Sequence, residues 1–447
     1  MSKPCARGAA LEILRRWGAA PAPLPPIVDM VLGRAGLDGR NRALALALVQ
    51  ETLRRLQDLD EHIAATSHHP LARMRPLTLA ALRLGLCQLL FFPTIPPSAA
   101  VDETVGAFKR LGQPRWLVGF VHGSLRTLAR DLPRLQQALT ASGGRHNHPP
   151  WLVNRWQTRL GEKTTLALCR ANNTVPVMSV RLHPGRTTVA HLLRSWHEAG
   201  LLVRHCAFAA DCLELPDFSG SPTELPGYDA GHFHVQDEAA QLSCRLLAPL
   251  REGGRYLDAC AGLGGKTSTL AQLLPDGAEL TAVEPEPRRF ALLHDNLARL
   301  GLADRVRCHA GRLQDLAAGA PPPFDGILLD VPCSGTGVIR RRPDIRWNRT
   351  PEDLAAMPPR QRALLDCAVS LLVPGGVLVY VTCSLEPEEN EEVITAFLAA
   401  HPDFSSPDPA ALLPPAATGL IGPDGFFHTS PLLGMDGFFA ARLVRTA

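Results

Sequence analysis

From residue 232 onward, short apolar strands alternate with helical segments. Strand candidates lie at 256–258, 279–283, 306–308, 327–329 and 377–381, and helical patterns at 266–274, 288–300 and 360–372. Such alternation predicts a parallel sheet with helices on both faces. Ligands of these sheets bind at the carboxyl ends of the strands. The residues that follow the strand candidates are therefore the first place to look for a functional site.

The rest of the chain divides into two further parts. Residues 4–139 carry apolar residues at helical spacing and predict an all-α domain. A linker rich in Gly and Pro follows at 142–150, and residues 150–222 mix helix and strand patterns. The expected order is thus an all-α domain, a small α+β domain and an α/β domain. Their predicted bounds are 1–141, 148–230 and 231–447.

Composition excludes several classes of protein. The length of 447 residues suits about three domains. The net charge of +3 says little about partners, and the scarcity of Lys relative to Arg reflects either a GC-rich genome, which we favour, or phosphate recognition. The longest apolar stretches, such as 84–92, are too short to span a bilayer, so no membrane partner is expected.

The cysteines are scattered through the chain. None of the 11 stands in a CxxC pair, which argues against a zinc ribbon, and we expect no metal site. An odd number of cysteines without a signal peptide predicts reduced thiols and a cytoplasmic location.

A glycine-rich loop follows the first strand of the α/β domain. Its sequence, DACAGLGGKT at 258–267, permits a tight turn and opens a helix whose N-terminal amides favour an anion. A P-loop would need Gly where Cys260 stands, and the GxGxxG register is also absent. Glu284 ends the next strand, where an acid either binds ribose hydroxyls or is a solvated loop residue. The arrangement predicts a nucleoside-type cofactor, and S-adenosylmethionine fits because its carboxylate can take the helix end.

Two cysteines follow later strands of the same sheet. Cys333 stands in DVPCSG at 330–335 and Cys383 in VTCSL at 381–385. Strand ends meet at one edge, so both thiols are expected to face one crevice. A thiol pair beside a cofactor suggests covalent chemistry on an electrophilic ring. The alternative is that both are small buried hydrophobic residues.

Several motifs occur together in one known family. They are DACAGLGGKT at 258–267, DVPCSGTG at 330–337, RPDIRW at 342–347 and TCSLEPEEN at 382–390. In combination they resemble the RNA cytosine-5 methyltransferases of the Nol/Nop/Sun (NSUN) superfamily. The resemblance implies a Rossmann-like class I methyltransferase domain that uses S-adenosylmethionine to methylate carbon 5 of a cytosine.

The resemblance extends upstream and covers nearly the whole chain. IPPSAAVDE at 95–103 and GFVHGSLR at 119–126 resemble the NusB-type RNA-binding domain. HPPWL at 148–152 and VQDEAAQ at 235–241 resemble the flanks of a small RRM-like domain. This layout resembles the family's bacterial 16S rRNA enzymes. It implies 16S rRNA as the partner, bound before the subunit is fully assembled.

The resemblance also assigns roles to individual residues. Cys383 would attack carbon 6 of cytosine, and Cys333 would release the covalent adduct. Asp330 would hydrogen-bond the base near N3, and Lys266 would orient the motif or approach the base. The expected cofactor residues are Asp258, Ala259, Cys260, Ala261, Gly262, Leu263, Gly264, Gly265, Lys266, Glu284, Arg289, Ala310, Gly311 and Asp330.

A basic segment follows the Cys333 motif directly. Its expected RNA-contacting residues are Arg340, Arg341, Arg342, Arg346 and Trp347. Cations beside an aromatic ring suit phosphate contacts and stacking on an unpaired base. The alternative is a solvated surface loop.

Departures from the family pattern leave rival functions open. Gly262 and Leu263 replace an Ala-Pro pair, and Ala310 stands where the family has an acid near the adenosine, a place that Asp315 is a candidate to fill. The lost acid gives some weight to a non-catalytic RNA-binding assembly factor. A tRNA cytosine-5 methyltransferase is disfavoured by the NusB-like domain. A DNA cytosine-5 methyltransferase would use the thiol of the Pro-Cys motif as its nucleophile.

Overall fold

The computed structural model describes residues 5–19, 22–142 and 146–446. Part of the predicted linker, residues 143–145, lies outside these ranges. Contacts divide the chain into two compact units. Unit 1 consists of residues 1–175, 219–221 and 339–349, and unit 2 of residues 176–218, 222–338 and 350–447. The sequence did not predict that residues 339–349 belong to unit 1.

Unit 1 is helical, as the apolar periodicity predicted. Its helices are α1 (Ala6–Ala19), α2 (Leu24–Arg34), α3 (Gly39–Arg54), α4 (Leu56–Thr66), α5 (Pro76–Phe91), α6 (Pro97–Arg110), α7 (Arg115–Arg130), α8 (Leu132–Ser142), α9 (Pro150–Asn172) and α15 (Ile345–Asn348), with the short 3₁₀ helix η1 (Leu71–Arg73). Helix α5 is buried along most of its length and packs against α1, α3, α6 and α7. It is therefore the centre of the helical core.

Unit 2 begins with a small antiparallel sheet in the order β2-β3-β1-β4. Its elements are β1 (Met178–Leu182), α10 (Val189–Glu198), β2 (Arg204–His205), β3 (Cys212–Leu215) and β4 (Phe233–Val235). Trp196 of α10 packs edge-on against Phe233 in the core of this sheet. Strand β4 pairs with β1, although the sequence assigned its residues to the α/β domain.

One pair of cysteines corrects the expectation of reduced thiols throughout. Cys206 and Cys212 form a disulfide. They stand opposite each other across the β2–β3 hairpin, where the Cys206 N–H donates to the Cys212 carbonyl at 3.0 Å. The sequence could not show this pair, because proximity depends on the register of the hairpin.

The larger sheet of unit 2 has the strand order β10-β12-β9-β8-β5-β6-β7. Its strands are β5 (Arg255–Asp258), β6 (Glu279–Glu284), β7 (Val306–Ala310), β8 (Phe324–Asp330), β9 (Leu372–Thr382), β10 (Phe404–Ser405) and β12 (Phe439–Arg445), and β11 (Phe427–His428) pairs with β12. Strands β5 to β9 run parallel, and β12 is antiparallel to β9. The expected parallel sheet is confirmed, with an antiparallel edge added.

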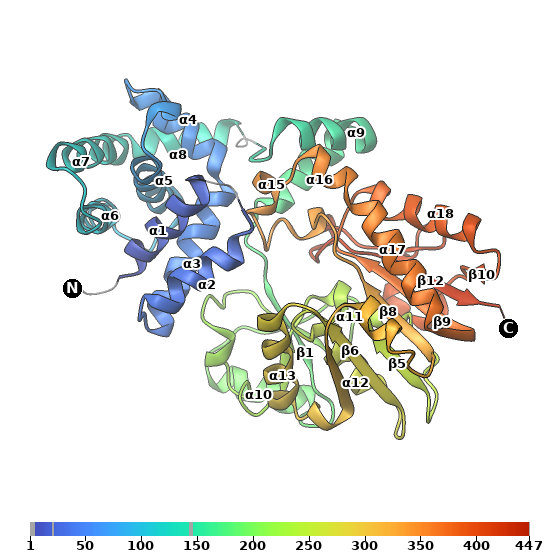
Figure 1. The fold of residues 1–447 in the computed structure, drawn as a ribbon. Coiled ribbons are helices and arrows are strands. Elements are labelled where there is room, and N and C mark those ends of the chain that lie inside the picture. The colour runs from blue at the N-terminus through green and yellow to red at the C-terminus, as the bar shows by residue number, and fades with distance from the viewer. Residues whose placement is uncertain (1–4, 20–21, 143–145, 447) are drawn as a thin grey trace. The chain divides into compact units, whose positions relative to one another are not determined.

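Helices cover both faces of this sheet (Figure 1). The helices of this part are α11 (Glu238–Arg245), α12 (Gly265–Leu273), α13 (Pro287–Leu300), α14 (Leu313–Ala318), α16 (Pro351–Ala355), α17 (Met357–Ser370) and α18 (Glu391–Ala400). Leu328 of β8 belongs to the core formed with α11, α12 and α13, whereas its neighbours Ile327 and Leu329 belong to the core formed with α14, α17 and α18. The alternation of side chains along a strand explains this division. Among the helices of the described residues, none has the length and apolar character needed to cross a membrane.

Candidate active site

Two neighbouring strands carry the cysteine motifs, as expected. Strands β8 and β9 pair in parallel, with Asp330 opposite Val381, and the Cys333 loop (331–338) and the Cys383 loop (383–390) follow them. The Sγ atoms of Cys333 and Cys383 lie 3.3 Å apart. The hydrogen bond to Cys383 and burial raise the pKa of Cys333 well above its usual range. The raised pKa favours the protonated form of Cys333, and either sulfur can be the donor in the contact between them.

A buried carboxylate connects the two loops. Glu389 is fully buried. Its Oε2 accepts hydrogen bonds from the Ser334 N–H at 2.8 Å and from Gln361 Nε2 at 3.0 Å, and its Oε1 accepts from the Ser384 hydroxyl at 2.8 Å. Ser334 follows Cys333 and Ser384 follows Cys383, so one carboxylate restrains the position of both sulfurs.

Further contacts make these loops rigid. The Gly337 N–H donates to the Cys383 carbonyl at 3.0 Å, and the Leu385 N–H donates to Thr336 Oγ1 at 2.9 Å. A Cβ on Gly337 would overlap the Gly437 carbonyl oxygen, so this position requires glycine. The requirement explains the second glycine of the DVPCSGTG motif.

An ion pair stands at the end of β8. Lys266 Nζ, from the first turn of α12, donates to Asp330 Oδ2 at 2.7 Å and lies 4.8 Å from the centre of the Phe438 ring. Burial tends to lower the pKa of Lys266, but the charge and hydrogen bond of Asp330 outweigh it, so the pKa is raised. Lys266 thus stays an ammonium group. Asp330 keeps 30% of its side chain exposed and is open to a ligand.

The glycine-rich loop joins β5 to α12. Gly264, which precedes the helix, has φ of +85°, and a Cβ there would meet Leu293 Cδ1 at 2.6 Å. At Gly262, φ is +58°, and a Cβ would meet no atom within 4 Å. Asp258 is fully buried beneath this loop and accepts a 2.6 Å hydrogen bond from the Thr267 hydroxyl. Burial raises the pKa of Asp258 to about 6. Burial also raises the pKa of Cys260, which suits a packing thiol.

The acid at the end of β6 is held in place. Glu284 is only 3% exposed, accepts the Glu286 N–H at 2.8 Å, and lies 3.3 Å from Arg289 Nη2. Ala310 pairs with Glu284 in the β6–β7 ladder, so the neighbouring position on β7 has no acid. Asp315 accepts the Arg312 N–H at 2.8 Å as the cap of α14. Its carboxylate is thus engaged locally.

The basic segment 339–349 differs most from the sequence prediction. It belongs to unit 1, and Arg346 is fully buried there. The Arg346 guanidinium donates to the carbonyl oxygens of Asn147 and Asn172, both at 2.8 Å, and to Asn173 Oδ1 at 2.5 Å. Arg346 therefore cannot contact RNA in this structure, and the prediction for it is wrong. The sequence shows that Arg346 is charged, but only the packing shows that its side chain is buried.

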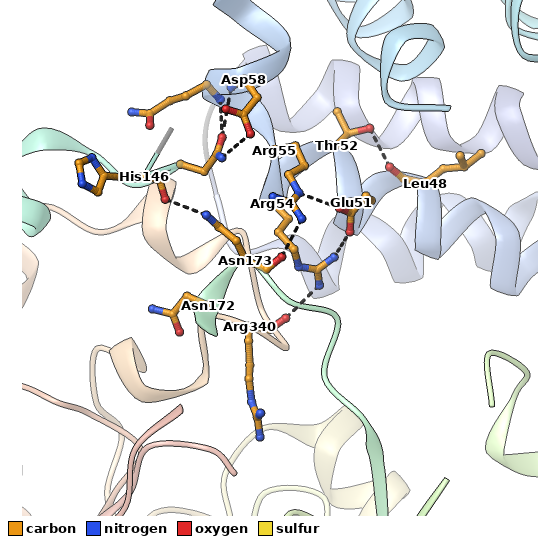
Figure 2. Close-up of polar contacts among 12 residues, drawn as sticks. Leu48, Glu51, Thr52, Arg54, Arg55, Asp58, His146, Asn172, Asn173 and Arg340 are labelled. Carbon is orange, nitrogen blue, oxygen red and sulfur yellow. Dashed lines mark hydrogen bonds and ion pairs between the residues drawn. The ribbon is translucent and has the colours of Figure 1, made fainter. Parts of the chain in front are cut away.

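Neighbours of Arg346 are held in the same way. Arg54 Nη2 donates to the Arg340 carbonyl at 3.0 Å (Figure 2). Arg340 is 5% exposed. The Trp347 indole N–H donates to the Leu53 carbonyl at 2.7 Å, and the ring packs on the helical core. The burial of Arg340 thus contradicts RNA contact through its side chain. Arg342 is exposed, and Arg341 and Trp347 are half-buried, so these three remain candidates.

Sequence reasoning missed the residues that support the thiols. Glu389 and Ser384 were visible inside a motif, but nothing in the motif showed that one carboxylate reaches both loops. Gln361 of α17 lies outside the motifs along the chain. Its only signal is proximity to Glu389 in the folded chain.

Three family models match this chain. The first, described as 16S rRNA methyltransferase RsmB/F, matches residues 245–444. The NusB family matches residues 5–130, and the ferredoxin-like domain of RsmF/B-type methyltransferases matches residues 148–219. Together they span most of the described residues.

Curated relatives and solved structures agree with these models. Ribosomal RNA small subunit methyltransferase B of Pseudomonas syringae is 38% identical over 94% of this chain and 88% of its own length. The protein of the same description from Sodalis glossinidius is 37% identical over 98% of this chain and 96% of its own. The crystal structure of PH0851 shares the fold, with a TM-score of 0.78 at 23% identity over 99% of each chain. A methyltransferase homologue from Pyrococcus horikoshii, 26% identical over 67% of this chain and 96% of its own, has a TM-score of 0.57.

Proposed function

Because this chain belongs to the RsmB/F family of 16S rRNA methyltransferases, we propose that it methylates carbon 5 of a cytosine through a covalent adduct with Cys383. The expected resemblance to RsmB (Sun/Fmu), the multidomain fold class and an S-adenosylmethionine-dependent rRNA methyltransferase activity are confirmed. The observation that carries the residue assignment is the 3.3 Å separation of the two sulfurs at adjacent strand ends.

The residues around the glycine-rich loop fit the methyl donor. Open space at Gly262 allows a ligand to approach the backbone, and the N-terminus of α12 favours a carboxylate. The buried carboxylate of Glu284 suits ribose hydroxyls at the end of β6. S-adenosylmethionine supplies an electrophilic methyl group when bound. The absence of an acid at Ala310 removes one expected contact, and Glu284 with Arg289 supplies the polar groups that remain.

The short distance between the two sulfurs supports different roles for Cys333 and Cys383. Cytosine carbon 5 becomes nucleophilic only after a thiolate adds to carbon 6, so one sulfur must ionise. Two sulfurs at 3.3 Å do not both ionise readily. The neighbouring sulfur and burial raise the pKa of Cys333, and we assign the attack on carbon 6 to Cys383. This order agrees with the roles that the family resemblance implied.

The remaining steps need groups close to the base. After methyl transfer, a base removes the proton from carbon 5 and the bond between Cys383 and carbon 6 breaks. Cys333 is placed to assist this release, because its sulfur adjoins that of Cys383. We assign Asp330 and Lys266 to the edge of the base near N3, where the ammonium group held by Asp330 can stabilise charge that develops during attack.

Single substitutions of the two cysteines test this assignment. Cys383→Ala should form no covalent adduct with 16S rRNA, whereas Cys333→Ala should form an adduct that is not released. Both are read as RNA–protein bands resistant to denaturing gel conditions, beside Cys367→Ala as a control on α17. Full activity in Cys383→Ala together with loss of the adduct in Cys333→Ala would reverse the roles.

Several finer expectations concern the substrate and its setting. We propose that the enzyme acts in the cytoplasm on 16S rRNA that is not yet fully assembled into the subunit. Bisulfite sequencing of RNA from a deletion strain and its parent should show a single lost methylcytosine in 16S rRNA. Purified chain offered naked 16S rRNA and assembled subunits should methylate only the former. Loss of a tRNA site instead would favour the tRNA enzyme.

A further inference from the structure

A cavity on unit 1 stands apart from every residue assigned so far. It has a volume of about 360 Å³ and lies between η1, the start of α5 and the start of α7. Its lining residues are His69, Pro70, Arg73, Met74, Arg75, Thr78, Trp116, Leu117 and Phe120. Three features of this lining point to one kind of ligand.

Aromatic rings line one side of the cavity. Trp116 is the second residue of α7 and is 67% exposed. Among the exposed large hydrophobic residues of the described chain, it is the one aromatic residue. Phe120 lies one turn further along the helix, and its ring meets that of His69 edge-on at 5.8 Å. Exposing a large aromatic ring beside a hollow is unfavourable unless a ligand covers it.

Cations line the other side. Arg73 ends η1 and Arg75 precedes α5, and both are exposed. Within the part of the chain that the structure describes, neither guanidinium forms an ion pair, and no residue that lines the cavity is acidic. An anionic ligand would therefore meet only attraction here.

A buried hydroxyl completes the lining. Thr78 is 2% exposed, and its Oγ1 has no hydrogen-bond partner among the described residues. A buried polar atom without a partner is costly, and such atoms call for an explanation. The Thr78 hydroxyl can both donate to and accept from a ligand that enters the cavity.

We propose that this cavity, the Trp116 pocket, binds an unpaired nucleobase of the RNA substrate. The base stacks on Trp116, its edge reaches the Thr78 hydroxyl, and the flanking phosphates lie on Arg73 and Arg75. Stacking on aromatic rings with nearby Arg is how proteins hold single-stranded RNA. The proposal rests on RNA as the substrate. It assigns RNA contact to the helical unit at residues other than the buried Arg346.

Binding of a labelled single-stranded RNA of about 12 nucleotides to the full chain tests the proposal. Trp116→Ala should weaken binding by about 5- to 100-fold, while Trp116→Phe should keep most of the affinity because the ring is retained. Arg73→Ala with Arg75→Ala should reduce the slope of log affinity against log salt by about 1.4. Arg126→Ala, an exposed residue of the same helix, is the control. Thermal melting of each variant establishes that it is folded.

Two further readouts separate this proposal from the methyltransferase assignment. Saturating RNA should quench the fluorescence that Trp116→Phe removes, and Trp116→Ala should raise the KM for 16S rRNA by a larger factor than it lowers kcat, while the covalent adduct with Cys383 still forms. An unchanged affinity in Trp116→Ala, or equal losses for Trp116→Ala and Arg126→Ala, would overturn the pocket without affecting the role of Cys383. If Trp116→Ala binds RNA as well as the wild type does, the Trp116 pocket would instead be a site for a protein partner.

Discussion

At the scale of single residues, the site depends on groups that hold the reactive ones. The two sulfurs are 3.3 Å apart because Ser334 and Ser384, their neighbours in the chain, bind the same Glu389 carboxylate. All three groups that contact this carboxylate are donors, which suits a side chain with acceptors only. Glu389 is thus a positioning residue for both thiols.

Replacing Glu389 by Gln should misplace the thiols. The amide keeps the volume but brings an NH₂ group against a donor, which costs about 1–3 kcal/mol of stability. A misplacement of about 1 Å costs roughly 100-fold in rate. We expect formation of the RNA adduct to slow by about 10- to 100-fold, while affinity for S-adenosylmethionine stays the same. Glu392→Gln, an exposed acid on α18, is the control. A normal rate of adduct formation in Glu389→Gln would contradict this role.

Asp258 should make folding stability depend on pH. Burial raises its folded pKa to about 6 from the usual 3.8, so the folded state binds the proton more tightly than the unfolded state. The resulting stability is fully present below about pH 4 and is lost as the pH rises to about 6, by roughly 3 kcal/mol.

Urea denaturation of Asp258→Asn measures this effect. The variant should lack the loss between about pH 4 and 6, and at pH 7.5 it should be as stable as the wild type or more so. The Asn carbonyl can still accept the Thr267 hydroxyl. Asp276→Asn, on the exposed turn before β6, should leave the pH dependence as it is. Parallel curves for Asp258→Asn and the wild type would rule the effect out.

At the scale of elements, the segment 339–349 shows how packing changes the meaning of a motif. Its cations looked like an RNA-binding surface in the sequence. In the structure, Arg346 binds Asn147, Asn172 and Asn173, and Asp344 accepts the Leu24 N–H at 2.9 Å. The segment is a structural part of the helical unit.

Substitution of Arg346 should therefore affect folding before RNA binding. Arg346→Met leaves buried acceptors without donors and should lower the unfolding free energy by about 2–5 kcal/mol. Arg342→Met, at an exposed position of the same segment, should be close to neutral in stability. Denaturant melts measure both. If Arg346→Met is as stable as the wild type yet binds RNA more weakly, the surface interpretation is restored.

The regular elements were the most predictable part of the fold. Strands at 256–258 and 279–283 and the helix at 288–300 were found within a few residues, because apolar periodicity and caps are local signals. Strand β4 was not predicted, and its residues were assigned to the α/β domain although the strand pairs with β1. Its three residues carry no local signal of their partner, which only tertiary pairing selects.

At the scale of the whole molecule, the chain cannot be divided at its sequence boundaries. Unit 1 includes residues 339–349, which lie within the C-terminal methyltransferase match. Ile345 is buried, and Trp347 packs on the helical core. The N-terminal domain is thus part of what keeps this segment folded.

Removal of residues 1–141 should therefore expose the segment. A chain of residues 142–447 should bind a hydrophobic dye and aggregate, because the helical core against which Trp347 packs is lost. Light scattering and dye fluorescence measure this outcome, and adding the separate 1–141 fragment should reduce both signals. A monomeric shortened chain with native Trp347 fluorescence would contradict the interpretation.

The reaction is expected to need no metal ion. Glu391, Asp424 and His428 come close enough to share an ion, but His428 Nε2 already lies 2.9 Å from Asp424 Oδ2. Dialysis against a chelator should leave methylation of 16S rRNA and thermal stability unchanged. A drop in either that zinc restores would identify a metal site at these residues.

The sequence by itself determined the order of the elements, the parallel sheet, the family and the two cysteines proposed to react. These depend on local periodicity and on motifs that are continuous along the chain. Only the tertiary structure decided that Glu389 holds both thiols, that Cys206 pairs with Cys212, and that Arg346 is buried. Each of these depends on contacts between residues distant in sequence or on the register of a hairpin, and a side chain's charge or thiol does not reveal which way it will face. The chemistry was readable from the chain, whereas the groups that position it were not.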